Sequence, residues 1–315
     1  MKRTLALVAA VLALASSAYG QTNISTLTNG LSTFVNNATA SLPFASAAGL
    51  DWSDAYIGSI VGVPPHFGVG IVTGATTLPG KNISPLVSAL GGGSLPFTDV
   101  PVPLAAVNAR IGGFLLPFDV GLKVGTIPGG LTISNYNISY QNYGFDVRYA
   151  VFQGEPLLPD VSVGAGVDYF ASEVSTTFGQ GATYLNQATG DTLSASAPKA
   201  TLDLSAVTFE AKVQVSKSLL ILTPYLGLSA LVGSATAKAS VNSNLSSTTG
   251  LSEWTSLIPG LSSTGFSQSN SQTAFGLKVY GGTSINLFVF RLDLQGLYSF
   301  LDGSYGGTIG ARFQL

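Results

Sequence analysis

A small set of charged side chains is spaced so that it could do chemistry. Only 9% of the 315 residues are charged, against about 25% in soluble domains. Asp146 and Arg148 stand two residues apart in an apolar stretch, and side chains at i and i+2 of a strand share a face. The pairs Glu210/Lys212 and Arg291/Asp293 repeat this spacing. The full set is Arg110, Asp119, Lys123, Asp146, Arg148, Asp168, Glu210, Lys212, Lys278, Arg291, Asp293 and Arg312.

These charges fit two kinds of interior. In a wet pore they would create a transverse field that sorts polar solutes. In a narrow barrel they would pair across strands as an ionic core, because small barrels fill their interiors with side chains. Seven of the twelve are cationic, which favours anionic solutes in the first case. A ten- to twelve-strand barrel lies between the two cases, so both stay open.

Catalytic and metal chemistry find little support. The single histidine, His66, stands between Pro65 and Phe67 in a turn predicted to be periplasmic. We expect it to be solvated and away from the lipid-exposed site that the triad of an outer-membrane lipase would use. Zero cysteines leave neither thiol chemistry nor a zinc cluster. A carboxylate pair of Asp146 and Asp168 is disfavoured because Arg148 would hold Asp146 ionised. We expect no enzyme, no metal and no cofactor, and the net charge of −2 argues against nucleic acid as a partner.

The charges lie in segments that alternate between apolar and polar residues. In residues 143–151, for example, the odd positions are apolar or aromatic and the even positions include Asp146 and Arg148. Such a period of two predicts β-strands with one polar face. The same alternation occurs in residues 67–71, 107–111, 119–124, 161–168, 207–215, 275–279 and 288–295.

Composition places these strands in a membrane. The chain is 46% hydrophobic with a mean hydropathy of +0.41, yet beyond the N-terminus it has no apolar run long enough for a spanning helix. Transmembrane strands distribute hydrophobicity in this way, since alternate residues face lipid. A soluble β-sandwich would need more charge on its outer face. The sequence predicts an all-β protein, an antiparallel up-and-down, porin-like barrel of about 10–12 transmembrane strands in the outer membrane of a Gram-negative-type envelope.

The links between strands alternate in length, as in outer-membrane barrels with short periplasmic turns and long outer surface loops. Long Gly-, Ser-, Thr- or Asn-rich stretches cover residues 79–100, 128–135, 179–198 and 242–270. The tight links are predicted at residues 63–65, 116–117, 156–159, 216–218 and 284–286.

The N-terminus divides into two segments before the barrel. Lys2 and Arg3, an apolar run and the sequence Ala18-Tyr19-Gly20 predict a signal peptide over residues 1–20, with cleavage before Gln21. Residues 21–50 repeat apolar positions at helical spacing, which predicts a short helix in the lumen or at the periplasmic mouth; a flexible leader is the alternative. Residues 51–315 are assigned to the barrel, with the strand expected near residues 52–61 the least regular.

The last eight residues resemble the C-terminal assembly signal of bacterial outer-membrane β-barrel proteins. The matching positions are Thr308, Gly310, Phe313 and Leu315, with Leu at the end where Phe is more usual. The resemblance covers the final strand and implies insertion into a lipid bilayer by the barrel-assembly machinery. The rest of the chain looks like an uncharacterised barrel family of spirochaete type. The N-terminal helical segment is similar in placement to the plug of long-chain fatty-acid transporters, although the mature chain is short for that family.

The sequence favours a channel or transporter for an unidentified small solute. One alternative is a structural or adhesin-like protein whose surface loops bind outside the cell. Another is uptake of a hydrophobic ligand past a plug formed by the N-terminal segment.

Overall fold

A computed structural model describes residues 24–79, 99–127, 130–133, 136–177, 182–186, 189–197, 199–242, 244–248, 250 and 266–315. The predicted signal peptide, residues 1–20, lies outside the described residues, as do residues 80–98 and 251–265 of the predicted long loops. None of the described helices is long and apolar enough to cross a membrane.

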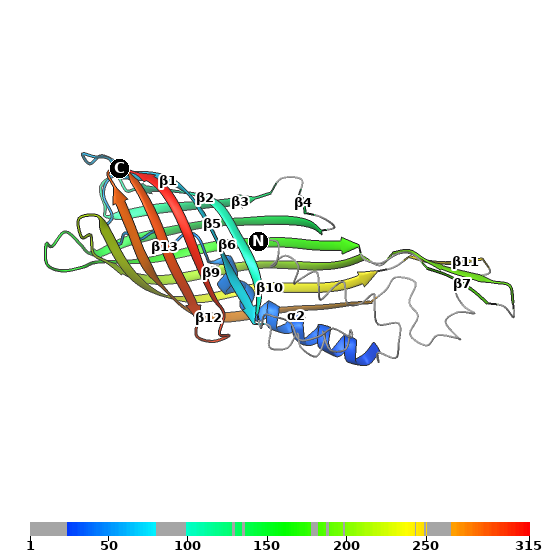
Figure 1. The fold of residues 1–315 in the computed structure, drawn as a ribbon. Helices are drawn as coiled ribbons and strands as arrows, with labels where there is room; N and C mark the ends of the chain where they lie inside the picture. The colour runs from blue at the N-terminus through cyan, green and yellow to red at the C-terminus, as the bar shows by residue number, and fades with distance from the viewer. Residues whose placement is uncertain are drawn as a thin grey trace.

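Ten long antiparallel strands of the described chain close into a barrel (Figure 1). Each strand pairs with the next in the chain, and β14 pairs with β1 to close the wall. The prediction of an all-β, antiparallel barrel with a short N-terminal helix is confirmed. The strands are β1 (Phe67–Pro79), β2 (Asp99–Gly112), β3 (Phe118–Thr126), β5 (Tyr136–Phe152), β6 (Asp160–Thr177), β9 (Lys199–Ser216), β10 (Leu222–Asn242), β12 (Phe266–Leu287), β13 (Phe290–Ser299) and β14 (Tyr305–Gln314).

Short strands extend the barrel at one end. β4 (Leu131–Ile133) pairs with β5. β7 (Ala182–Leu185), β8 (Thr192–Ala195) and β11 (Leu245–Ser247) form a separate three-stranded sheet. We call it the distal sheet; it projects beyond the barrel at the right of Figure 1.

The two ends of the barrel differ in the length of their links. At the end we call the turn end, neighbouring strands are joined across residues 113–117, 153–159, 217–221 and 288–289. At the opposite, loop end, the links cover residues 80–98, 127–135, 178–198 and 243–265, with a short link at 300–304.

Two of the predicted tight links lie elsewhere. Residues 284–286 are part of β12, and the turn falls at residues 288–289, where Phe288 adopts a φ of 57°. A two-residue hairpin needs such a positive φ. The sequence does not predict this conformation here, because phenylalanine rarely adopts it. Residues 63–65 lead from the lumen into β1 and do not join two strands.

Near the turn end, alternating side chains divide into an apolar outer face and a polar inner face. In β9, Val207, Phe209 and Val213 are exposed, while Thr208, Glu210 and Lys212 are buried. An exposed apolar face on every second residue is the pattern of a lipid-facing strand. We call the ring of these outward residues the lipid belt.

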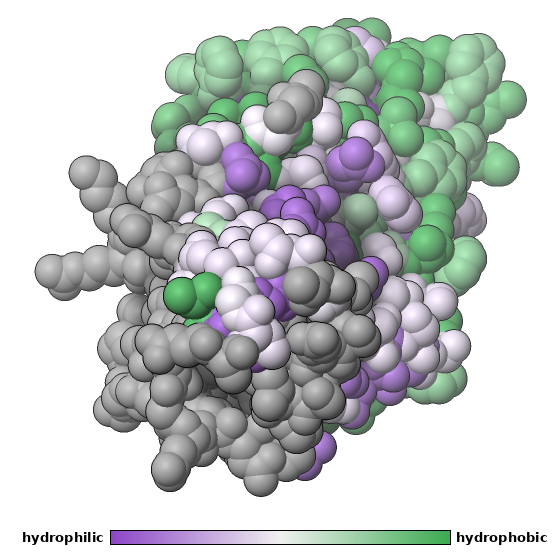
Figure 2. All heavy atoms as spheres, turned by 90° about the vertical axis from the view of Figure 1, so that its right-hand side faces the viewer, coloured by the Kyte–Doolittle hydropathy of each residue, from purple (hydrophilic) through white to green (hydrophobic). Residues whose placement is uncertain are grey.

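Toward the loop end the polarity of the two faces is exchanged. Further up β9, Leu202 and Leu204 point inward and are buried, whereas Thr201 and Asp203 lie on the outer face. On β10, Ala235, Ala237 and Ala239 are likewise buried. The strands therefore continue beyond the lipid belt as an extension with an apolar interior and a polar exterior. Viewed from the loop end, hydrophobic residues gather on the barrel behind these paler, more polar residues (Figure 2).

The extension of the wall is incomplete, and a helix fills the gap. β13 and β14 have 10 residues each, against 22 in β12. Helix α2 (Ile24–Ser46) packs against β12, β10, β9 and β1, the strands on either side of the short β13–β14 hairpin. After α2, residues 47–57 run through the lumen without regular structure, and residues 58–66 lead out at the turn end and into β1. The barrel wall thus begins at Phe67, and residues 51–66 of the range assigned to the barrel form no strand, because their side chains and carbonyls bond to the inner wall instead.

Candidate functional site

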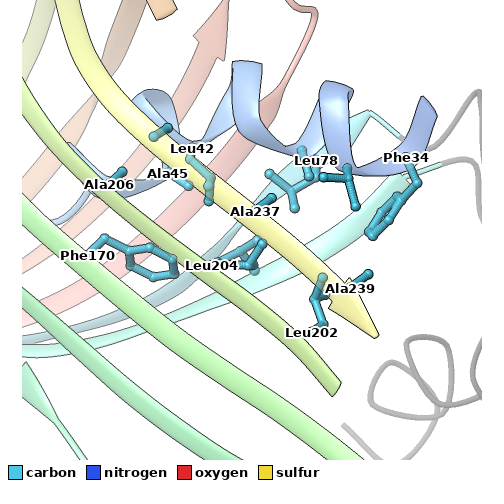
Figure 3. Packing of buried hydrophobic residues seen from close by; sticks show 14 of the residues in the cluster. Phe34, Leu42, Ala45, Leu78, Phe170, Leu202, Leu204, Ala206, Ala237 and Ala239 are labelled. Atoms are coloured by element: carbon cyan, nitrogen blue, oxygen red, sulfur yellow. The ribbon is translucent and has the colours of Figure 1, made fainter. Parts of the chain in front are cut away.

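The loop-end half of the lumen is filled by apolar contacts of α2. One face of the helix, including Phe34 and Leu42, packs on inward side chains of the wall (Figure 3). Leu42 is completely buried, and Thr33 and Asn36 lie on the exposed, uncharged face. The cluster, which we call the apolar collar, comprises Leu31, Phe34, Val35, Ala38, Leu42, Ala45, Leu78, Val102, Tyr140, Phe170, Leu202, Leu204, Ala206, Ala235, Ala237 and Ala239.

The C-terminus of α2 is fixed to the wall by polar contacts. The Ser46 hydroxyl donates to Thr208 Oγ1 on β9 at 2.7 Å. Lys123 Nζ on β3 donates to the carbonyls of Ser46 (2.8 Å) and Ala48 (2.7 Å) and pairs with Asp168 at 2.8 Å. A cation at this position satisfies carbonyls that the helix end leaves free and complements the helix dipole.

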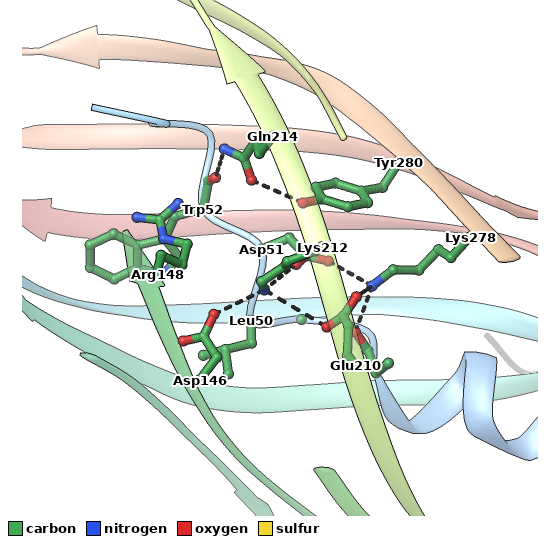
Figure 4. Close-up of polar contacts among 12 residues, drawn as sticks. Leu50, Asp51, Trp52, Asp146, Arg148, Glu210, Lys212, Gln214, Lys278 and Tyr280 are labelled. Atoms are coloured by element: carbon green, nitrogen blue, oxygen red, sulfur yellow. Dashed lines mark hydrogen bonds and ion pairs between the residues drawn. The ribbon is translucent and has the colours of Figure 1, made fainter. Parts of the chain in front are cut away.

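Asp51 of the luminal segment is held by two lysines on strands that are separated by β10. Its carboxylate lies 2.8 Å from Lys212 Nζ and 2.9 Å from Lys278 Nζ (Figure 4). Lys278 also contacts Glu210 at 2.8 Å and the Ala47 carbonyl at 3.0 Å. Both lysines are buried. Asp51 therefore joins β9 and β12 through the lumen.

Asp54 occupies a second cationic site nearer the turn end. Its carboxylate lies 2.5 Å from Arg291 Nη1 and 3.1 Å from Arg312 Nη2, and it accepts a hydrogen bond from Gln314 Nε2 at 3.0 Å. Its backbone carbonyl accepts from Arg148 Nη1 at 2.6 Å. Four side chains from three strands thus converge on one residue of the luminal segment.

Trp52 lies between these two carboxylates and stacks on cations. The Arg312 guanidinium lies 4.5 Å and the Arg110 guanidinium 5.7 Å from its ring centroids. Its carbonyl accepts from Gln214 Nε2 at 2.7 Å. Such cation–π contacts are strongest where water is excluded, and Trp52 is buried.

The wall charges pair mainly with partners on other strands. Asp146 contacts Arg110 (2.8 Å) and Lys212 (2.9 Å), and Asp119 bridges Arg110 and Arg148 at 2.6 Å each. Asp146 and Arg148 share the inner face but bind partners on other strands. Glu210 and Lys212 are 3.8 Å apart, farther than either is from its other partners. Arg291 binds Asp54, while Asp293 contacts Arg312 at 3.4 Å.

Inward glycines leave room for these pairs. A Cβ on Gly121 would collide with Asp146 Oδ1 and lie 2.6 Å from Arg110 Nη2. A Cβ on Gly144 would collide with Asp168 Oδ1 and lie 2.8 Å from Lys123 Cε. Alternating glycines and charges thus belong to one packing pattern.

Sequence reasoning missed Asp51 and Asp54. Ten of the twelve charges in the set are buried inside the barrel, and Arg291 and Asp293 are half-buried. The seven cations and five acids of that set leave two cations unmatched, and Asp51 and Asp54 are the only acidic residues between positions 21 and 66. The cationic excess is therefore balanced within the chain, a count that could have identified both residues.

A small cavity lies beside the luminal segment. A cavity beside Asp51 and Trp52, bordered by Tyr225 and Arg312, gives about 20 Å³ of room for the centre of a water molecule, enough for roughly one water. At this depth the lumen is a packed ionic core.

The surroundings of His66 differ from those expected. It is buried at the start of β1, where its ring packs edge-on to Tyr56 with centroids 6.4 Å apart. It is not a solvated turn residue, because the luminal segment folds over it. Within the described ranges, His and acidic residues form no group of three or more that could hold a metal ion.

The C-terminal residues lie in the strand that closes the barrel. Thr308 and Gly310 face Gly74 and Val72 of β1, and Phe313 packs against Phe67 and Phe290 with ring centroids 6.4 and 5.9 Å away. The Leu315 amide donates to the Phe67 carbonyl at 3.0 Å. The residues of the assembly signal therefore form the seam between the first and last strands.

Comparisons with solved structures return outer-membrane barrels. The outer membrane protease OmpT of Escherichia coli is 8% identical over 80% of this chain and 97% of that chain, with a TM-score of 0.40. Ail, the attachment invasion locus protein of Yersinia pestis, is 13% identical over 79% and 98%, with a TM-score of 0.28. Omp33 of Acinetobacter baumannii is 8% identical over 79% and 98%, with a TM-score of 0.25. Likenesses this distant carry no inference about role.

No curated protein matches the chain. A family model described as Lsa36-like matches residues 6–315, which includes the helix, the luminal segment and every strand of the wall. The chain is an outer-membrane β-barrel that belongs to the Lsa36-like family.

Proposed function

We propose that the protein is a sealed outer-membrane barrel that displays its loop-end extension for binding outside the cell. The observation that carries the proposal is the occupied lumen, with the apolar collar at one depth and the Asp51 and Asp54 ion pairs at another. A solute crossing the barrel would have to displace both the helix packed in the collar and the ion-paired segment around Asp51 and Asp54. The asymmetry of the links supports an orientation with the turn end in the periplasm, and the seam at Thr308–Leu315 supports insertion by the barrel-assembly machinery.

The loop-end structure is suited to present a surface. Asp191 accepts hydrogen bonds from Ser247, at 2.7 Å, and from Thr248, and so ties β11 to the β7–β8 hairpin. The outer face of the extension is polar, with Glu173, Asp203 and Lys238 in a cross-strand row. A long wall with a packed interior places these groups beyond the lipid belt without requiring an open pore.

Attachment of cells that display the protein tests the binding role. Replacing residues 179–198 and 243–265 by short Gly-Ser linkers removes the distal sheet but leaves β9, β10 and β12 intact. We expect attachment to fall to the level of cells without the protein. Glu155→Gln, on an exposed link of the turn end, is the matched surface control, and folding is checked by heat-modifiable migration in gels. Unchanged attachment by the folded deletion variant would contradict the proposal.

Conductance in planar bilayers distinguishes this role from the channel that the sequence favours. We expect refolded protein starting at Gln21 to give no steady conductance. Deleting residues 24–57 removes α2, the collar contacts and the Asp51 and Asp54 ion pairs, and should open a pore if the wall persists. Steady conductance or solute flux with the intact chain would support the channel. Uptake of a hydrophobic solute that requires residues 23–42 would support the plugged transporter.

A further inference from the structure

Each connection at the turn end carries a large apolar side chain at its tip. Val63, Leu115, Leu157, Leu220 and Phe288 have exposed fractions between 84% and 102%. They come from five separate links. We call these five residues the apolar tips. Their neighbours Phe114, Leu116, Leu158, Leu219 and Ile221 are also exposed.

Charge is almost absent from the same links. Among residues 61–65, 113–117, 153–159, 217–221 and 288–289, only Glu155 and Lys217 are charged. Turns that face water gain nothing from exposing leucine, and burying such a side chain fully is worth about 1.5–3 kcal/mol. Repetition around the whole rim indicates one continuous apolar environment.

On strand β9 the lipid belt alone is shorter than the apolar band of a membrane barrel. On β9 it runs from Val207 to Val215, which at about 3.3 Å per residue and a tilt of about 40° covers roughly 20 Å. The apolar band of membrane barrels is about 25 Å tall. Leu219 and Leu220 follow Val215 toward the turn end and extend the height of the lipid-facing surface on this strand. The tips therefore continue an existing lipid-facing surface.

Several backbone polar groups of these links have partners within the protein or are absent, as contact with lipid requires. Pro117, Pro156 and Pro159 have no N–H group to satisfy. Leu219 and Leu222 exchange backbone hydrogen bonds at 2.7 and 2.8 Å. Lys217 Nζ donates to the carbonyls of Glu155 (2.9 Å) and Leu158 (2.6 Å) on the neighbouring link. Satisfied backbone groups are a condition for contact with hydrocarbon.

We propose that the turn end is embedded in the membrane, with the apolar tips at the boundary between acyl chains and headgroups of the periplasmic leaflet. Lys217 can keep its ammonium group at the headgroups while its stem lies along apolar neighbours. The rim is therefore covered by lipid instead of extending into the periplasm. This inference is independent of the binding role proposed for the loop end.

Spin labels on single cysteines test the depth, since the chain has no cysteine of its own. Leu157→Cys and Leu220→Cys are labelled in phosphatidylcholine vesicles. Accessibility to oxygen, which partitions into lipid, is compared with accessibility to a water-soluble nickel chelate. Leu228→Cys in the lipid belt is the lipid reference, and Leu185→Cys on the distal sheet, 60% exposed, is the water reference.

We expect both turn-end labels to resemble position 228, with oxygen accessibility exceeding nickel accessibility. Nickel accessibility like that of position 185 would overturn the proposal and leave the rim as a surface for a periplasmic partner. Protection from both reagents would also overturn it, in favour of contact with a second copy. As an independent readout, Leu157→Asn should raise the unfolding equilibrium constant in vesicles about ten-fold or more, whereas Leu185→Asn should change it less than two-fold.

Discussion

The two halves of the lumen hold the same N-terminal segment by different chemistry. Toward the loop end, one face of α2 packs on the wall residues of the apolar collar, which are chiefly leucine and alanine. Toward the turn end, residues 47–57 are surrounded by arginines, lysines and glutamines that bind Asp51, Asp54 and backbone carbonyls. The first half depends on buried area and fit, and the second depends on every charge having a partner.

This difference predicts different responses to substitution. Removing part of an apolar contact leaves a cavity, whose cost depends on how far the surroundings collapse. Removing one member of a buried ion pair leaves the other charge uncompensated, which costs more than the pair contributes. The ionic half should therefore be the more sensitive of the two.

Asp54→Ala is expected to lower the free energy of unfolding the most. It leaves Arg291 and Arg312 without their shared carboxylate, and loss of one buried partner destabilises by about 3–5 kcal/mol. Urea unfolding of the refolded protein in vesicles measures the change. Glu173→Ala, on the exposed outer face of β6, is the control and should stay within about 0.5 kcal/mol. Equal effects of the two variants would refute the sensitivity of the ionic half.

Leu42→Ala tests the apolar half. Leu42 is fully buried between α2 and the wall, and such truncations cost about 2–5 kcal/mol. The same unfolding assay at low and high salt sharpens the contrast, because the loss should not change with ionic strength. A loss that disappears in high salt would mean that electrostatic contacts, and not packing, hold α2.

Ala237→Leu, which adds volume where α2 meets β10, is expected to lower the free energy of unfolding the least of the three substitutions. Ala237 is fully buried in the apolar collar, and overpacking costs about 1–3 kcal/mol. Ala230→Leu on the same strand points to the lipid belt and should be neutral or stabilising. If both variants were neutral, the helix would not be pressed against β10.

The sequence predicted the turn-end half of the barrel better than the loop-end half. Residues 207–215 combine apolar outward and polar inward positions, so their facing could be derived from alternation. Residues 200–206 keep the period but exchange the polarity, because outside the membrane the polar face meets water and the apolar face meets α2. Alternation alone does not show where that exchange occurs.

Ion-pair partners could not be predicted for a geometric reason. Residues i and i+2 of one strand are about 6.6 Å apart, whereas neighbouring strands are about 4.8 Å apart. Long side chains also reach past a neighbouring strand: Asp146 on β5 bonds to Arg110 on β2 and Lys212 on β9, across β3 and β6. These partners depend on register and on the luminal segment. Asp51 and Asp54 lie in a segment with no periodicity, so only the charge count of the interior pointed to them.

The central claim, that the end of α2 lies inside the barrel against β9, is tested most directly by an engineered disulfide. The Ser46 and Thr208 hydroxyls are 2.7 Å apart, and the chain contains no other cysteine, so Ser46→Cys with Thr208→Cys should oxidise almost completely in folded protein. Ser46→Cys with Thr236→Cys, which places the second thiol on the outer face of β10, should stay reduced. Mass spectrometry after oxidation gives the answer. Two free thiols in the folded Ser46/Thr208 variant would contradict a lumen filled by the N-terminal segment.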